Sequence, residues 1–401
     1  MSKHSQWTVL LTFGLIVGIN QMLVLNFAPL VTTLQAHFHI SEFWAGLPTL
    51  LNPLTYLIFG FHAGIALDHH GYKKVVSYAA VAMTAAALFR SIDLGYWGLL
   101  SSQTVIAVSG VYITSAIAKV VSDWFPVEKT GMATGVVMAG MLLGIAVGMG
   151  ATALLVTENG LYPTMMHYAF VSLITTALFI ALCKENRSQL VASNESGISE
   201  IKSLFRDNNL VIVMWLSFLI IGATNGFNAW FEKIMNTNGL NPEQASYVIA
   251  CALLFSIIGA AIIPALSDRV GRRRPFLILS SLCGLLFTYP LLTSTQLNQA
   301  LSIGAAAGFF QLPAYILIIA LSAEFSGPAR AGLANSMVML TSSLGGLIIA
   351  LAMERVGVWF SWPQSALVLI ACYAISLVFM RKLQEPNIEI EEEPKESHQI
   401  S

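Results

Sequence analysis

Long apolar runs recur along the whole chain, and they constrain its fold more than any other feature of the sequence. A bilayer core of about 30 Å is crossed by about 20 apolar residues in a helix. Strands are not expected, because the runs are long and do not alternate with a period of two. A helix also satisfies its own backbone hydrogen bonds, as hydrocarbon requires. We therefore expect twelve transmembrane helices, at residues 8–33, 43–67, 75–92, 96–121, 131–156, 162–183, 209–231, 245–267, 276–293, 297–323, 330–353 and 364–381.

Charged residues are too scarce for a soluble fold. Asp, Glu, Lys and Arg make up 10% of the chain, against about 25% in ordinary soluble domains. The 20 basic and 21 acidic residues are balanced, so no large basic field exists to hold nucleic acid. The composition excludes a soluble enzyme, a nucleic-acid-binding protein and a disordered chain. It predicts an all-α, integral multi-pass protein of the inner or plasma membrane, with the lipid bilayer as a partner.

The basic residues are distributed unevenly between the two sets of loops. If the N-terminus is cytoplasmic, nearly all Lys and Arg residues fall in inner loops and tails, and only Arg90, Lys233 and Arg355 fall outside. This asymmetry follows the positive-inside rule. We expect both termini to be cytoplasmic.

The longest polar stretch between spans divides the chain in two. It predicts a six-helix bundle at residues 1–183, a cytoplasmic linker at 184–208 and a second six-helix bundle at 209–381. Residues 382–401 carry mostly Glu among their charges and predict an acidic, solvated cytoplasmic tail.

An internal repeat relates the two predicted bundles. The loop after the second span contains Gly64, Asp68, Gly71, Lys73 and Lys74. The loop after the eighth span contains Asp268, Gly271, Arg273 and Arg274, and Asp68 and Asp268 lie 200 positions apart. Two six-span halves in parallel orientation predict a pseudo-twofold axis along the membrane normal.

Each part of the repeated motif suits a contact that forms and breaks between helices. Glycine permits a tight turn with positive φ, and Asp at a helix end can accept hydrogen bonds from a neighbouring helix N-terminus or pair with Arg. A polar loop alone would explain one copy but not two. We interpret as a conformational switch the residues Gly64, Asp68, Gly71, Lys73, Lys74, Asp268, Gly271 and Arg273.

These two loops resemble the signature of the major facilitator superfamily of secondary transporters, and the resemblance covers the whole chain. It implies transport by alternating access, with spans 1, 4, 7 and 10 lining a central cavity. The first copy has His69 where Arg is usual, and the second has Pro264 in place of Gly. Ile106 stands where the superfamily often has an Arg in its fourth span, which puts proton coupling through that position in doubt. The chain also weakly resembles feline leukaemia virus receptor-related and cyanate permease-like carriers.

The polar residues of those four spans are the candidate substrate contacts, because polar groups in lipid usually face a cavity. No Asp, Glu, Lys or Arg lies near the middle of a span. Amide and aromatic groups suit a neutral, zwitterionic or singly charged small organic solute, held by hydrogen bonds, stacking or cation–π contact. The alternatives are interhelical hydrogen bonds and plain packing. The candidates are Asn20, Gln21, Asn26, Gln103, Tyr112, Asn225, Asn228, Trp230, Gln311 and Tyr315.

Two further features leave alternatives open. His62 lies within the second span and can carry a coupling proton, although a buried structural imidazole is the commoner role. The fifth span is rich in glycine, which fits close helix packing and also resembles the superfamily's antiporter signature. Multidrug efflux by proton antiport is therefore a second hypothesis, and a ligand sensor that does not transport is a third.

Motifs for other chemistry are missing from the sequence. It has neither a Gly-rich nucleotide loop nor a hydrolase constellation, so we expect no enzyme activity and no cofactor. The four cysteines lack metal-site spacing, so we expect no metal. We expect a monomer that binds a small-molecule substrate.

Overall fold

The computed structural model describes residues 3–185, 202–240 and 242–385, and all regular structure in these ranges is helical. Most of the predicted linker 184–208 and of the predicted tail 382–401 lies outside these ranges. Eleven helices of the described residues are long and apolar enough to cross a membrane. The chain is an all-α membrane protein.

The predicted third span corresponds to helix α4, which is not among the eleven. Helix α4 has 18 residues and begins at Tyr72 with Lys73 and Lys74 in its first turn. It joins the end of α3 to the start of α5, and Trp124 at the far end of α5 donates a hydrogen bond to Tyr72. At about 1.5 Å per residue, α4 spans roughly 27 Å, which is close to the thickness of the hydrocarbon core.

The first group of helices, which we call the N-terminal half, includes two interrupted spans. The first predicted span, 8–33, breaks after Leu25 and resumes beside Pro29, and the fifth, 131–156, breaks at Ala151. The helices are α1 (Lys3–Leu25), η1 (Ala28–Leu30), α2 (Val31–Phe38), α3 (Glu42–His70), α4 (Tyr72–Phe89), α5 (Gly95–Trp124), η2 (Val127–Lys129), α6 (Thr130–Gly150), α7 (Thr152–Asn159) and α8 (Leu161–Leu182).

The second group, the C-terminal half, repeats this order of helices. Its first span contains a π-helical turn, η4, between two α-helices. The helices are α10 (Asn208–Leu216), η4 (Ser217–Ile221), α11 (Gly222–Thr237), α12 (Pro242–Val270), α13 (Arg274–Leu292), α14 (Leu297–Ser326), α15 (Ala331–Trp359), η5 (Pro363–Ser365) and α16 (Ala366–Lys382).

Glycines let pairs of helices approach to backbone contact within each half. A Cβ atom on Gly144 of α6 would lie 1.9 Å from the carbonyl oxygen of Gly18 in α1. In the other half, a Cβ atom on Gly259 of α12 would lie 2.0 Å from the carbonyl oxygen of Phe309 in α14. Close approach of this kind is how helices pack in lipid, where no hydrophobic force drives them together. The predicted glycine-rich fifth span therefore serves packing.

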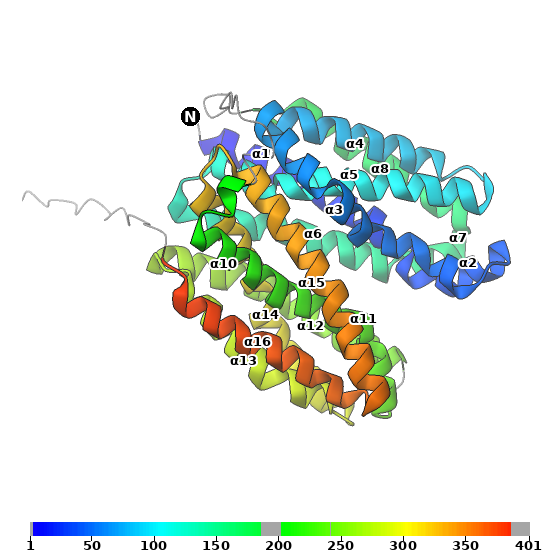
Figure 1. Ribbon diagram of the computed structural model, residues 1–401. Coiled ribbons are helices and arrows are strands. Elements are labelled where there is room, and N and C mark those ends of the chain that lie inside the picture. The colour runs from blue at the N-terminus through cyan, green and yellow to red at the C-terminus, as the bar shows by residue number, and fades with distance from the viewer. Residues whose placement is uncertain (1–2, 186–201, 241, 386–401) are drawn as a thin grey trace, which may run out of the picture.

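The two halves lie side by side in Figure 1 and meet mainly through α3 with α15 and α6 with α12. Hydrogen bonds tie the loops at one end of the molecule together: Gln6 to Trp124, Arg273 to Val127, and Arg330 to Ser203. We call this end, which carries Gly71, 125–130, 203–207, 271–274 and 327–330, the basic end.

Candidate functional site: two carboxylates that bridge the halves at the basic end

Asp68, in the last turn of α3, caps a helix of the other half. Its Oδ1 accepts a hydrogen bond from the backbone N–H of Gly332 at 3.0 Å, and its Oδ2 accepts one from Leu333 at 2.8 Å. These N–H groups lie in the first turn of α15 and have no partner within the helix. The helix dipole also favours a negative charge at this position. Glycine at 332 leaves room for this contact, because a Cβ atom there would lie 2.7 Å from Asp68 Oδ1. We call this the Asp68 contact.

Asp268, in the last turn of α12, makes the equivalent contact in the opposite direction. Its Oδ1 accepts a hydrogen bond from Gly131 N at 3.2 Å, and its Oδ2 accepts one from Met132 N at 2.7 Å, at the start of α6. A Cβ atom on Gly131 would lie 2.6 Å from Asp268 Oδ1. This is the Asp268 contact, and each half therefore caps a helix of the other.

The glycines of the repeated motif shape the approach to both contacts. Gly71 and Gly271 turn the chain after α3 and α12 with φ of +81° and +68°. Gly64 lies one turn before Asp68, and a Cβ atom there would lie 2.7 Å from Leu333 Cα. The motif thus brings α3 against the start of α15.

Arg273 anchors the Asp268 contact. Its side chain is fully buried and forms ion pairs with Asp268 and with Glu324, whose Oε1 lies 2.7 Å from Arg273 Nη2. Nη2 also donates to Thr130 Oγ1 at 3.0 Å, so the guanidinium bridges both halves. Burial acts to lower the pKa of Arg273, but the carboxylates of Glu324 and Asp268 raise it above its usual value. The group stays charged.

Lys119 has the corresponding place beside Asp68, and it comes from a different element. Its buried Nζ lies 4.0 Å from Asp68 Oδ1 and 3.6 Å from Asp123 Oδ1, and it donates to the carbonyl of Pro328 in the other half. Lys73, which matches Arg273 in the repeat, instead places its backbone N–H 3.4 Å from Glu185 Oε1. The repeat therefore predicts the two carboxylates but not the cation of the first contact.

The sequence profile of the Major Facilitator Superfamily matches residues 10–237 and 217–399, which together are nearly the whole chain. The chain belongs to the major facilitator superfamily. It is an integral multi-pass membrane protein and a secondary transporter that works by alternating access, and it is not an enzyme.

Relatives of this superfamily member cover different shares of its length. A protein of Archaeoglobus fulgidus is 28% identical over 55% of this chain and 100% of its own. The MFS transporter asaE of Aspergillus flavus is 26% identical over 71% of this chain, which spans 64% of asaE. The multidrug resistance protein MdtG of Salmonella arizonae is 26% identical over 67% of this chain and 68% of its own.

Solved superfamily structures share the fold of this transporter. The Escherichia coli fucose:proton symporter FucP has a TM-score of 0.79 at 16% identity, covering 95% of this chain and 98% of its own. The proton:xylose symporter XylE has a TM-score of 0.77 at 12% identity, and the match covers 96% of this chain and 97% of XylE.

The candidate amides of the N-terminal half bond within that half. Asn20 Nδ2 contacts the Ile106 carbonyl and Met83 Sδ, both at 3.4 Å, and Gln21 Nε2 lies 3.4 Å from Asn20 Oδ1. The other two amides are fully buried. Asn26 contacts Met165 Sδ, whereas Gln103 receives a hydrogen bond from Arg90 and donates to the carbonyls of Leu23 and Val24.

Two of the C-terminal candidates are exposed. Asn225 and Asn228 lie on an exposed face of α11 with Glu232, while Gly222 packs the helix against Gly345 of α15. A polar face of this kind is not expected toward lipid. Gln311 is half-buried on α14.

The aromatic candidates make specific contacts. Trp230 donates to the Ala350 carbonyl at 2.9 Å and packs against Trp362, with ring centroids 4.9 Å apart and ring planes tilted by 41°. The Tyr315 hydroxyl lies 3.2 Å from Met339 Sδ.

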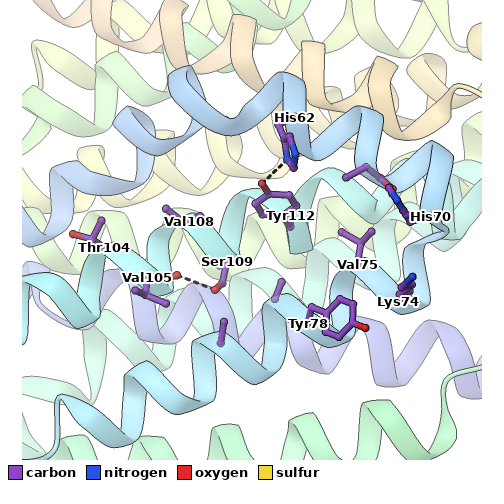
Figure 2. Close-up of a pocket in the computed structure, with 13 residues that line it drawn as sticks. His62, His70, Lys74, Val75, Tyr78, Thr104, Val105, Val108, Ser109 and Tyr112 are labelled. Atoms are coloured by element: carbon purple, nitrogen blue, oxygen red, sulfur yellow. Dashed lines mark hydrogen bonds between the residues drawn. The ribbon is translucent and has the colours of Figure 1, made fainter. Parts of the chain in front are cut away.

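Tyr112 and His62 lie apart from the other candidates. The Tyr112 hydroxyl is 2.7 Å from His62 Nδ1, and both side chains line a cavity on the flank of the N-terminal half (Figure 2). Tyr112 is half-buried and His62 is exposed.

Sequence reasoning missed Lys119, Glu324 and Asn335 as parts of the contact between the halves. Asn335 is fully buried and donates from Nδ2 to the carbonyls of Thr114 and Ser115 in the other half, at 3.1 and 2.9 Å. The sequence did contain one signal for these residues. Each is a polar residue near the inner end of a span, where a loop cannot expose it to solvent, so it needs a polar partner within the protein.

Proposed function

We propose that this protein carries a small organic solute through a site between residues 1–183 and 209–381, which rock against each other about the linker 184–208. The observation that carries the proposal is the reciprocal pair of Asp68 and Asp268 contacts. Each joins the halves through hydrogen bonds that must break when the basic end opens. Two such charge-assisted contacts are suited to a reversible closure.

The orientation of the protein in the membrane follows from the distribution of its basic residues. Lys73, Lys74, Arg273 and Arg274 lie at the basic end, and the positive-inside rule assigns that end to the cytoplasm, together with both termini and the acidic tail. The described state is then closed to the cytoplasm. Asp68, Gly64, Gly71, Asp268, Gly271 and Arg273 act as the switch, and Lys73 and Lys74 hold the loop at the lipid headgroups.

The solute meets amide and aromatic groups rather than a fixed counter-charge. Asn225, Asn228 and Gln311 are the amides that this state leaves accessible, and Trp230 lies beside them on α11. Such groups orient a neutral, zwitterionic or singly charged organic molecule by hydrogen bonding and stacking. The likeness to MdtG keeps multidrug efflux as the second candidate function.

Counterflow in proteoliposomes tests this function. A panel of neutral, zwitterionic and singly charged metabolites and drugs is first screened for a rise in melting temperature. Compounds that raise the melting temperature are then labelled, and each should accumulate in proteoliposomes that were preloaded with its unlabelled form. Binding without counterflow would identify a sensor, and counterflow of many unrelated cations would identify multidrug efflux.

Asp68→Asn should slow counterflow about tenfold while solute affinity changes less than about threefold. An amide accepts weaker hydrogen bonds than a carboxylate, and ~1.4 kcal/mol of lost stabilisation changes an equilibrium tenfold. The matched control is Asp207→Asn, because Asp207 caps α10 within its own half, at 2.8 Å from Asn209 N. Equal rates in the two variants would contradict the switch role of Asp68.

A further inference from the structure

A cavity of about 640 Å³ opens on the flank of the N-terminal half, away from the other half. Its walls are α3 and α4, which both pack more extensively on α5 than on each other, so that α5 forms the floor (Figure 2). His62, which lines it, is two residues from Gly60 and Gly64, the positions of α3 that approach α15. In a helix this places His62 on the opposite face, toward the surrounding lipid. We call this cavity the flank groove.

The flank groove is mostly apolar, and several of its polar side chains bond within the protein: Thr104, Ser109 and His70 contact carbonyls of their own helices, and His62 contacts Tyr112. Val105, Val108, Ala79 and Ala82 line it with the aliphatic surface expected for contact with hydrocarbon. The bond between His62 Nδ1 and the Tyr112 hydroxyl reduces the polar surface that these two side chains present to an acyl chain.

The groove is longer than one leaflet of the hydrocarbon core is deep. From Thr104 to Tyr112 along α5, and from His62 to His70 along α3, it extends about 12 Å each way, at about 1.5 Å per residue. Because Tyr112 and His62 meet in the middle, the total is roughly 24 Å, which exceeds the ~15 Å depth of half a hydrocarbon core.

A second cavity, of about 520 Å³, adjoins the groove at the basic end, and Lys74 lines both. Lys73, Lys74 and Lys184 line this second cavity, and Glu185 is its one acidic side chain. The Glu185 carboxylate faces the backbone N–H of Lys73, so the excess charge of the cavity is positive. A basic cavity that shares Lys74 with an apolar groove fits an anion that carries a hydrocarbon tail.

We propose that an anionic phospholipid of the leaflet at the basic end binds here, with its phosphate on Lys74, Lys73 and Lys184 and one acyl chain in the flank groove. The three lysines favour an anionic headgroup by charge complementarity, and the open apolar groove accommodates an acyl chain. The bound lipid lies beside Gly71, in the turn that leads into the Asp68 contact.

Lipid titration followed by native mass spectrometry tests this site. The probes are phosphatidylglycerol and phosphatidylcholine with identical chains, added to the delipidated full-length protein. The wild type should bind phosphatidylglycerol about fivefold more tightly, and Lys74→Gln should abolish that preference, since one Lys near a membrane surface contributes about that factor. Lys382→Gln, at an exposed position of the other half, should retain it.

The groove is tested by filling it. Ala82→Phe should weaken both lipids severalfold, whereas Ala85→Phe, which changes an exposed position on the same helix outside the groove, should not. Unchanged phosphatidylglycerol binding in Lys74→Gln or Ala82→Phe would overturn the proposal. Displacement of the lipid by millimolar inorganic phosphate alone would also overturn it, because the site would then hold a free anion.

Discussion

Arg273→Gln should lower the stability of the folded protein by about 3–5 kcal/mol, the usual cost of removing one partner from a buried ion pair. Glu324 is fully buried and depends on Arg273 for its charge compensation, and Asp268 loses its ion pair in the same substitution. The bridge from Arg273 to Thr130 in the other half is also lost. The melting temperature in detergent and in nanodiscs should therefore fall sharply.

The neighbouring residue provides the control for Arg273. Arg272 has the same charge and is exposed, so Arg272→Gln should leave the melting temperature nearly unchanged. Adding Glu324→Gln to Arg273→Gln should recover part of the loss, because the fully buried Glu324 carboxylate is then no longer left without its cation, although Asp268 still lacks its ion pair. Equal melting temperatures for Arg273→Gln and Arg272→Gln would refute the anchoring role of Arg273.

Gly144→Ala should destabilise the N-terminal half by about 1–3 kcal/mol or more, as overpacking does in close-packed interiors. The new Cβ atom would lie 1.9 Å from the carbonyl oxygen of Gly18, which is backbone and cannot rotate away. Helices α1 and α6 would have to separate. The melting temperature and the monodisperse fraction in size-exclusion chromatography should both decrease.

Gly150→Ala isolates the packing effect, because Gly150 is in the same helix and a Cβ atom there meets nothing within 4 Å. Gly144→Ala gains helix propensity of up to about 1 kcal/mol, and Gly150→Ala, at the last residue of α6, gains less. Gly150→Ala should thus be neutral or stabilising. If the two variants melt together, the glycines of α6 do not set the distance between α1 and α6.

The sequence allowed the fold and the two carboxylates of the basic-end contacts to be predicted, for identifiable reasons. Hydropathy defines helices that must satisfy their backbone internally, and the repeat around Asp68 and Asp268 marks equivalent turns. Which helix N-terminus each carboxylate caps depends on how the halves pack, so Gly332 and Gly131 could not be assigned as partners. Lys119 breaks the symmetry of the repeat, because it takes the place beside Asp68 that the repeat assigns to Lys73. Its position on α5 gave no sign of this role.

The candidate amides show more clearly what the sequence alone cannot predict. Asn20, Asn26 and Gln103 were expected in a cavity because they are polar residues in spans, but the same polarity serves bonds between helices. Whether an amide faces a cavity depends on the rotation of its helix, as the exposed Asn228 and the buried Gln103 illustrate. Their roles in substrate binding stay predictions.

The central claim is that the Asp68 and Asp268 contacts hold the basic end closed. Distance measurement between spin labels tests it most directly, in a background without the four native cysteines. Exposed label sites at the basic end are Lys129 in the N-terminal half and Arg272 in the C-terminal half, and at the opposite end Leu94 and Trp359. The wild type should give one short distance at the basic end. Asp68→Asn combined with Asp268→Asn should add a longer distance there and a shorter one at the opposite end, whereas unchanged distributions in this double variant would contradict the account.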